Sequence, residues 1–140
     1  MREIKIRAIK RYLMNETFPD LYDKKNMEFV YGTGVYQDTH NTWIILKNPE
    51  KKSFSQMTAN IVDPKTVGQW TGLKDKNGKD IYEGDILAGK KWKTSAITFK
   101  DGMFKFGSIS LVTVTNCPPE FCCEKIGNIY ENPELLEVNP

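Results

Sequence analysis

The feature that most constrains this fold is a series of short, β-branched apolar segments between residues 67 and 115, separated by glycine-containing turns. The segments recur at roughly ten-residue spacing, which is typical of antiparallel strands joined by hairpins. Each segment is too short for an ordinary helix, and the turns reverse the chain repeatedly. The region therefore predicts a small, highly curved antiparallel barrel.

Turn residues divide this region into individual strands. We expect strands at Val67–Leu73 and Ile81–Ala88, the second one broken at Gly84-Asp85. The turn between them, Lys74–Lys79, contains Asn77-Gly78, a dipeptide that favours a type I′ hairpin turn. Asp85 is expected to accept hydrogen bonds from backbone N–H groups at its bend.

The rest of the C-terminal half follows the same pattern. A tight turn at Asp101-Gly102 is predicted, and Asn132 is expected to cap a short helix that starts at Pro133, with Leu135 and Leu136 packing back. The strands expected here are Ser95–Phe99, Met103–Phe106, Ile109–Thr115 and Lys125–Tyr130.

The N-terminal part is less regular. Alternating apolar and charged residues predict a strand at Glu3–Ala8, and residues 14–30 have the composition of a loop. Phe29–Tyr36 and Thr42–Leu46 are expected strands, whereas Phe54–Ile61 is ambiguous. The 140 residues thus predict one mainly β domain (α+β at most), with a β-rich elaboration at 1–66, a barrel at 67–140 and a short C-terminal helix.

The net charge of +2 is too small to indicate a dedicated nucleic-acid binder, but it hides a cancellation. Residues 65–107 carry nine basic and five acidic side chains, and residues 117–140 carry one basic and five acidic. These +4 and −4 segments can pair within one chain or between subunits. No apolar run is long enough to span a membrane, and the N-terminus lacks the apolar core of a signal peptide, so we expect a cytoplasmic protein.

Motifs for chemistry are weak. The stretch from Gly84 to Lys91, GDILAGKK, resembles a phosphate-binding loop but ends in lysine and sits in strand-like sequence. Asp75, Asn77 and Asp80 are better explained as turn residues than as calcium ligands. We therefore expect no enzyme activity and no cofactor.

Cys117, Cys122 and Cys123 are too few and too irregularly spaced for a disulfide framework or a structural zinc site. Free, at least half-buried thiols in a reducing compartment and no bound metal are the expectation.

One cluster suggests binding. Aromatic rings among cations are the elements of a single-stranded nucleic-acid platform. The alternative is a solvated loop with a tryptophan that covers the end of the barrel. The candidate surface consists of Trp70, Tyr82, Lys90, Lys91, Trp92 and Lys93.

Three blocks carry a resemblance to a known family. They are QWTGLKDKNGKDIYEGDI at 69–86, IGNIYENPELL at 126–136 and REIKIRA at 2–8. In this order they resemble the YopX family of phage and prophage proteins. The resemblance implies an SH3-like small barrel and a phage or prophage origin in a bacterial cytoplasm. It implies no biochemical activity and no catalytic residues.

Together these observations predict a phage or prophage accessory protein that is not an enzyme. We expect it to form a homo-oligomer or to bind a protein partner through exposed strand edges. Weak binding of single-stranded nucleic acid is the alternative, and a membrane partner is not expected.

Overall fold

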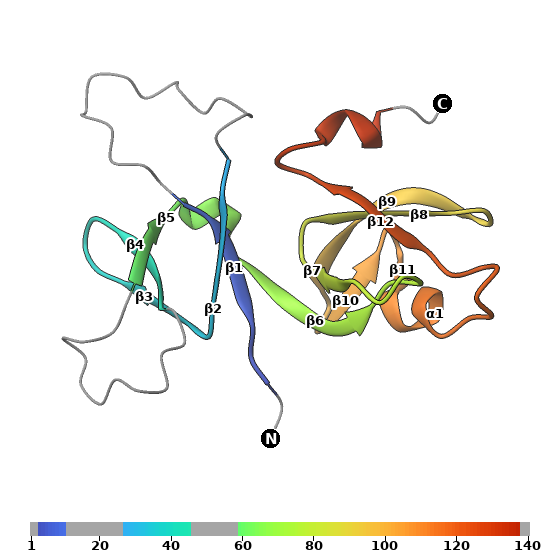
Figure 1. The fold of residues 1–140 in the computed structure, drawn as a ribbon, viewed down its shortest axis with the longest axis horizontal. Coiled ribbons are helices and arrows are strands. Elements are labelled where there is room, and N and C mark those ends of the chain that lie inside the picture. The colour runs from blue at the N-terminus through green and yellow to red at the C-terminus, as the bar shows by residue number, and fades with distance from the viewer. Residues whose placement is uncertain (1–2, 11–26, 46–58, 138–140) are drawn as a thin grey trace. The chain divides into compact units, whose positions relative to one another are not determined.

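The computed structural model describes residues 3–10, 27–45 and 59–137 (Figure 1). The chain folds into two compact units, Met1–Gln69 and Trp70–Pro140. Both consist mainly of antiparallel strands, so the predicted mainly β class is confirmed. Closure of the strands into a barrel and the assignment of one domain stay predictions. Most of the loop predicted at 14–30, together with Leu46 and residues 54–58, lies outside the described residues.

The first unit contains a strand pair and a three-stranded sheet. β1 (Ile6–Ile9) pairs with β2 (Phe29–Gly32), while β3 (Gly34–Gln37), β4 (Thr42–Ile45) and β5 (Ala59–Val62) form the sheet in the order β3-β4-β5. β1 confirms the strand predicted near the N-terminus. β5 resolves the ambiguous segment, whose last residues are extended.

The single strand predicted at Phe29–Tyr36 is wrong, because β2 and β3 are separate strands. Thr33 lies between them, and its N–H donates to the Ile45 carbonyl on β4 at 3.0 Å. The chain passes so close to β4 that a Cβ on Gly32 would overlap that carbonyl oxygen. Only glycine fits this crossing, which takes the chain from one set of strands to the next.

A small core and a 3₁₀ helix complete the first unit. The buried core consists of Ala8, Val30, Ile44 and Val62. The helix, η3 (Pro64–Thr66), follows Asp63, whose carboxylate accepts the Lys65 N–H.

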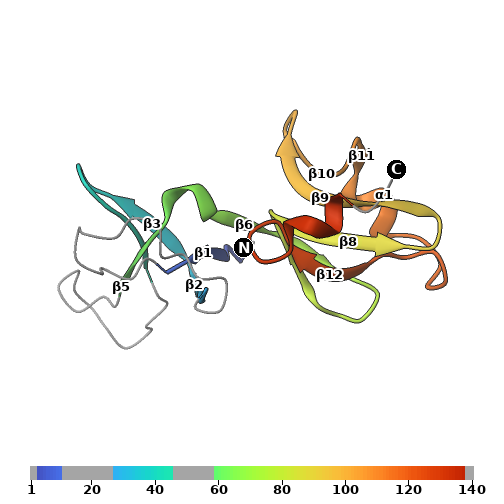
Figure 2. The ribbon, with the colours of Figure 1, turned by 90° about the horizontal axis from the view of Figure 1, so that it is seen from above.

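The second unit is built on a five-stranded sheet in the order β11-β10-β9-β8-β12 (Figures 1 and 2). β6 begins in the first unit, where it pairs with β1, and continues into the second, where it pairs with β7. The bounds are β6 (Gly68–Lys74), β7 (Asp80–Tyr82), β8 (Asp85–Gly89), β9 (Trp92–Lys100), β10 (Met103–Phe106), β11 (Ile109–Ser110) and β12 (Glu124–Asn128).

Two hairpin turns test the turn predictions. The tight turn at Asp101-Gly102 is confirmed: both residues have positive φ, 55° and 76°, and Lys100 pairs directly with Met103. The type I′ turn at Asn77-Gly78 is wrong. Of that pair only Gly78 has positive φ, and residues 75–79 form a longer loop organised by a side chain that is described below.

The strand predicted at Ile109–Thr115 is also wrong. β11 ends at Ser110, and α1 (Leu111–Thr115) follows. Leu111 and Val114, three residues apart, share one face of this helical turn and are completely buried. Their burial in the core outweighs the strand preference of the β-branched residues between them.

The main hydrophobic core lies in the second unit, with Leu73, Trp92 and Phe104 partly buried against it. The C-terminal helix is the short 3₁₀ helix η4 (Pro133–Leu136), and the predicted packing of Leu136 is wrong, because this side chain is 37% exposed. The core residues are Ile81, Leu87, Ile97, Phe106, Leu111, Val114 and Cys123.

Candidate functional site

The predicted binding surface does not form one exposed platform. Trp70 on β6 pairs with Tyr82 on β7, and Tyr82 is only 5% exposed. A buried ring offers no face on which a base can stack. Lys90 and Lys91 are exposed in the β8–β9 turn, and exposed Lys93 lies near the start of β9.

Trp92 is half-buried and anchored. Its indole N–H donates to the Phe121 carbonyl at 2.9 Å, and its ring packs against the core. The Lys91 ammonium lies 3.8 Å from the centre of the Phe121 ring, within cation–π distance. Trp92 therefore covers this end of the core, and nucleic-acid binding by the six residues stays a prediction.

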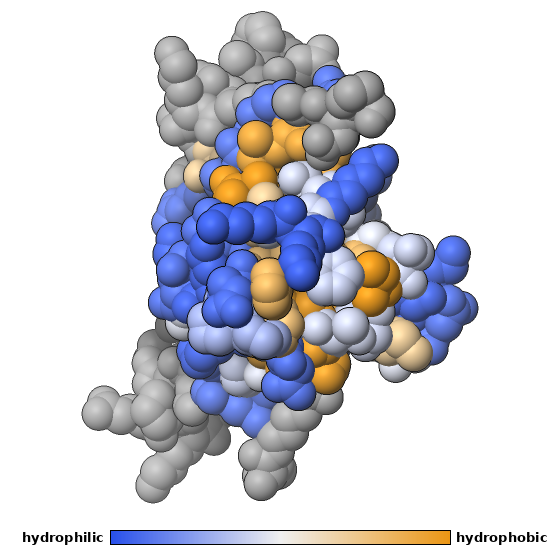
Figure 3. All heavy atoms as spheres, turned by 90° about the vertical axis from the view of Figure 1, so that its right-hand side faces the viewer, coloured by the Kyte–Doolittle hydropathy of each residue, from blue (hydrophilic) through white to orange (hydrophobic). Residues whose placement is uncertain are grey.

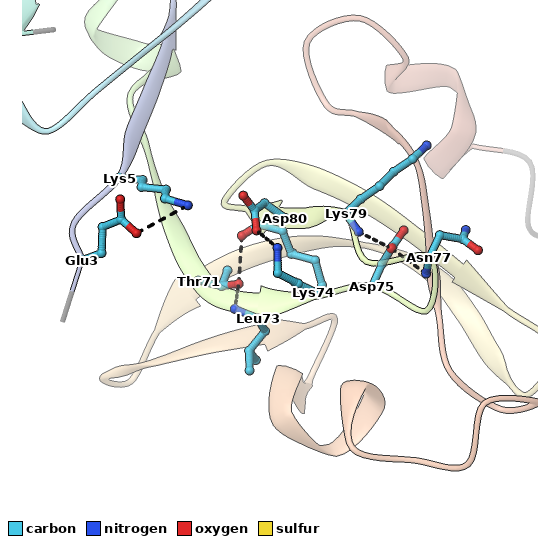
Figure 4. Close-up of polar contacts among 10 residues, drawn as sticks. Glu3, Lys5, Thr71, Leu73, Lys74, Asp75, Asn77, Lys79 and Asp80 are labelled. Atoms are coloured by element: carbon cyan, nitrogen blue, oxygen red, sulfur yellow. Dashed lines mark hydrogen bonds and ion pairs between the residues drawn. The ribbon is translucent and has the colours of Figure 1, made fainter. Parts of the chain in front are cut away.

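The turn between β6 and β7 is organised by Asp75, which is 7% exposed. One carboxylate oxygen accepts the N–H groups of Asn77 at 2.8 Å and Lys79 at 2.9 Å (Figure 4). The other accepts the N–H of Lys125 on β12 at 2.9 Å. The carboxylate thus closes the turn and ties it to a strand fifty residues away. Asp80 instead pairs with the Lys74 ammonium at 2.7 Å.

A second buried carboxylate lies at the start of β8. Asp85 is completely buried, and it accepts the Tyr82 N–H at 2.8 Å, so the predicted backbone hydrogen bond is confirmed. The Lys125 ammonium is 3.1 Å from the same oxygen. The turn before it uses Gly84 at φ 85°, a conformation that favours glycine.

The motif blocks 69–86 and 126–136 contact each other. The Ile129 N–H donates to the Gly84 carbonyl at 2.8 Å, and a Cβ on Gly84 would lie 3.2 Å from the Tyr130 ring. The Asn128 side chain accepts the N–H groups of Tyr130 and Glu131. These motif residues therefore hold the two blocks together in the second unit.

The predicted capping role of Asn132 is wrong. Its side-chain oxygen turns back and accepts the Asn128 N–H at 3.3 Å. A Cβ on Gly127 would lie 2.5 Å from that oxygen, so this arrangement requires glycine beside it. The competing donor on β12, the Asn128 N–H, explains why a residue with the right helix-start pattern does not cap η4.

The three cysteines lie close together, all as free thiols. Cys117 and Cys122 are half-buried, with their sulfur atoms 2.9 Å apart, and Cys123 is 2% exposed. Burial and the neighbouring Cys122 thiol raise the pKa of Cys117, and burial raises the pKa of Cys123 to about 11. Within residues 3–10, 27–45 and 59–137, no three His, Cys, Asp or Glu side chains are grouped to hold a metal ion.

Sequence reasoning missed an exposed apolar surface on the β9–β10 hairpin. Ile97 is buried, but Phe99, two residues further along the same strand face, is 51% exposed. It pairs across the hairpin with Phe104, at 5.1 Å between ring centres and in an edge-to-face arrangement. Met103 is also exposed. The strand alternation that identified this hairpin could not show that its inner face extends beyond the core.

The fold and this surface define a small, mainly antiparallel β protein whose motif residues stabilise the second unit. A profile of the YopX protein family matches residues 21–137, so the chain belongs to the YopX family. It is also similar to a crystal structure of a protein from Enterococcus faecalis, with 29% sequence identity and a TM-score of 0.54 over 95% of this chain and 97% of that one. No curated protein matches the chain. No helix in the described part of the chain is long and apolar enough to cross a membrane.

Proposed function

We propose that this protein is a non-enzymatic phage or prophage accessory protein that assembles with itself in the bacterial cytoplasm. The observation that carries the proposal is the exposed Phe99 ring on the inner face of the β9–β10 hairpin, which packs edge-to-face against the half-buried Phe104. Contact between an aromatic ring and water is unfavourable, so burying the ring against a second protein surface would stabilise an assembly.

The hairpin surface is both apolar and basic. It lies at the end of the hairpin, with Phe99 on one face and Lys100, Met103 and Lys105 on the other. In Figure 2 the hairpin extends from the upper edge of the second unit. Asp101 pairs with Lys105 at 2.8 Å, which leaves the hairpin with a net positive charge.

A complementary surface exists on the C-terminal segment of the same unit. Leu136 on η4 is 37% exposed, and Glu134 and Glu137 lie close to it in the sequence. We define this acidic surface as Glu131, Glu134, Leu136 and Glu137. Figure 3 shows one side of the second unit, where hydrophobic residues are exposed between hydrophilic ones. A second copy of the chain therefore offers the basic hairpin a partner of opposite charge and similar apolar character.

This pairing joins two different surfaces, so it is a head-to-tail contact that builds rings or open chains of subunits. Within one chain, η4 also lies beside β9, which brings part of the acidic surface near the basic strand. The basic and acidic surfaces can therefore also pair within one chain. Measuring the oligomeric state distinguishes pairing within one chain from pairing between two copies.

Light scattering coupled to size-exclusion chromatography, over a range of protein and salt concentrations, tests the proposal. We expect oligomers that dissociate as salt rises, because screening weakens the contact between opposite charges. Phe99→Ser should give a monomer, while Thr98→Ser, on the neighbouring exposed position, should leave assembly unchanged. A wild-type chain that is monomeric under all conditions would contradict the proposal.

A second candidate function is weak binding of single-stranded nucleic acid. The exposed lysines 90, 91 and 93 beside Trp92 favour it. Fluorescence anisotropy of labelled oligonucleotides at low salt tests it, with the triple substitution of these lysines by glutamine as the comparison. Binding should weaken steeply with salt and disappear in the variant; equal binding by both proteins would refute a role for this turn.

A further inference from the structure

Two of the three thiols are positioned to react with each other. The Cys117 and Cys122 sulfur atoms are 2.9 Å apart, whereas a disulfide bond is about 2.0 Å long. Closing the bond therefore requires a relative movement of about 1 Å. Backbone carbonyls hold both groups in place: the Cys117 thiol donates to Val114 at 3.2 Å and the Cys122 thiol donates to Cys117 at 2.8 Å.

We propose that Cys117 and Cys122 form a reversible intrachain disulfide, with a small disulfide compound of the glutathione class as the oxidant. Both side chains are half-buried, so the oxidant can reach them. The bond closes the segment Cys117–Cys122, which contains Pro118-Pro119 and connects α1 to β12.

The third thiol is not part of this pair. Cys123 packs in the hydrophobic core with Ile81 and Leu87, where the oxidant has little access. The location of the cysteines thus selects one of the three possible pairings.

The chemistry balances with the named oxidant. The thiolate of one cysteine attacks a sulfur of the small disulfide, whose S–S bond breaks, and one small thiolate leaves and takes up a proton. The second cysteine, after losing its proton, attacks the protein sulfur of this mixed disulfide and releases the second small thiolate. The two protein thiols lose two electrons and two protons, and the small disulfide is reduced to two thiols.

Closure would act on the neighbouring lysine-rich turn. Phe121, inside the closed segment, accepts the Trp92 indole N–H and lies under the Lys91 ammonium. Forming or breaking the disulfide therefore changes the segment that holds Phe121, whose contacts with Lys91 and Trp92 anchor the β8–β9 turn.

The test equilibrates the reduced full-length chain with mixtures of reduced and oxidised glutathione without oxygen, then traps free thiols by alkylation and maps the peptides by mass spectrometry. We expect Cys117 linked to Cys122 and Cys123 alkylated. The equilibrium constant for closure in the folded chain should exceed that of the urea-unfolded chain by about tenfold or more, because the fold raises the effective concentration of the two thiols.

Variants sharpen the result. Cys123→Ala should close to the same extent as the wild type, whereas Cys117→Ala and Cys122→Ala should stop at the mixed disulfide. Alkylation of all three cysteines in the wild type, a link that involves Cys123, or equal closure in folded and unfolded chains would each overturn the proposal. The wild-type peptide map decides the matter even if a variant fails to fold.

Discussion

Replacing Asp75 by alanine should destabilise the second unit more than any other single change in the β6–β7 turn. The substitution removes three hydrogen bonds at once, those that the two carboxylate oxygens accept from the N–H groups of Asn77, Lys79 and Lys125. The first two bonds hold the turn, and the third ties it to β12. Alanine leaves all three donors to be satisfied by water.

The magnitude follows from the number of bonds and their surroundings. A hydrogen bond to a charged group contributes about 1.5–3 kcal/mol, and the two donors in the turn lie where water can replace the carboxylate. If each of those two bonds contributes about 1.5 kcal/mol or less, and the bond to Lys125 contributes within the full range, Asp75→Ala should lower the free energy of unfolding by about 3–5 kcal/mol. Asp75→Asn keeps one acceptor oxygen and should fall between alanine and the wild type.

Urea unfolding in a Trp43→Phe background measures this, because the emission of Trp70 and Trp92 then reports on the second unit. The matched control is Asp80→Asn in the same turn, which weakens the partly exposed ion pair with Lys74 and should cost less than about 1 kcal/mol. If Asp75→Ala costs no more than this control, the argument that the carboxylate organises the turn is refuted.

Three further predictions concern other contacts and buried groups of the second unit. Lys125→Met should cost about 3 kcal/mol in urea unfolding, because it takes the ammonium away from the fully buried Asp85 carboxylate; a loss below about 1 kcal/mol contradicts this. Gly78→Ala and Gly84→Ala both place alanine at positive φ, but only the second meets a ring among the described residues, so it should cost about 1 kcal/mol more, and equal losses would count against that contact. Because burial raises the pKa of Cys123 from 9.0 to about 11, the contribution of its neutral thiol to the free energy of unfolding should be fully present below pH 9 and be lost by about 1.4 kcal/mol per pH unit between pH 9 and 11. Cys123→Val should show a correspondingly smaller slope, and an identical slope in both proteins would refute the assignment.

The features that could be predicted from sequence are those set by neighbouring residues. Alternation identified β1 and most strands of the second unit, and Asp101-Gly102 identified a tight turn, because both depend on local backbone preferences. The hydrogen bond from Tyr82 to Asp85 spans three residues and was predictable for the same reason. The motif blocks also led to the YopX family.

The candidate site was less predictable. Tyr82 and Trp92 were grouped with lysines because they are close in sequence, but burial decides whether an aromatic ring is available, and burial depends on distant strands. The exposed Phe99 was assigned to an ordinary strand. Nothing in its neighbours shows that the buried face of β9 ends at Ile97, since the core around it is filled by residues of α1 and of β7, β8 and β10.

By itself, then, the sequence determined the β class, the positions of the reversals and the family, because strand alternation, glycine and aspartate act through the backbone of adjacent residues. Only the tertiary structure decided that Leu111–Thr115 is helical, that Asn132 faces β12, and that Cys117 and Cys122 touch. In each case the deciding contact lies outside the local strand pattern. The core buries two positions of the helix, the Asn132 oxygen accepts an N–H of β12, and the loop between the two cysteines brings their sulfur atoms together. Local preferences are worth less than about 1 kcal/mol per residue, and such contacts outweigh them.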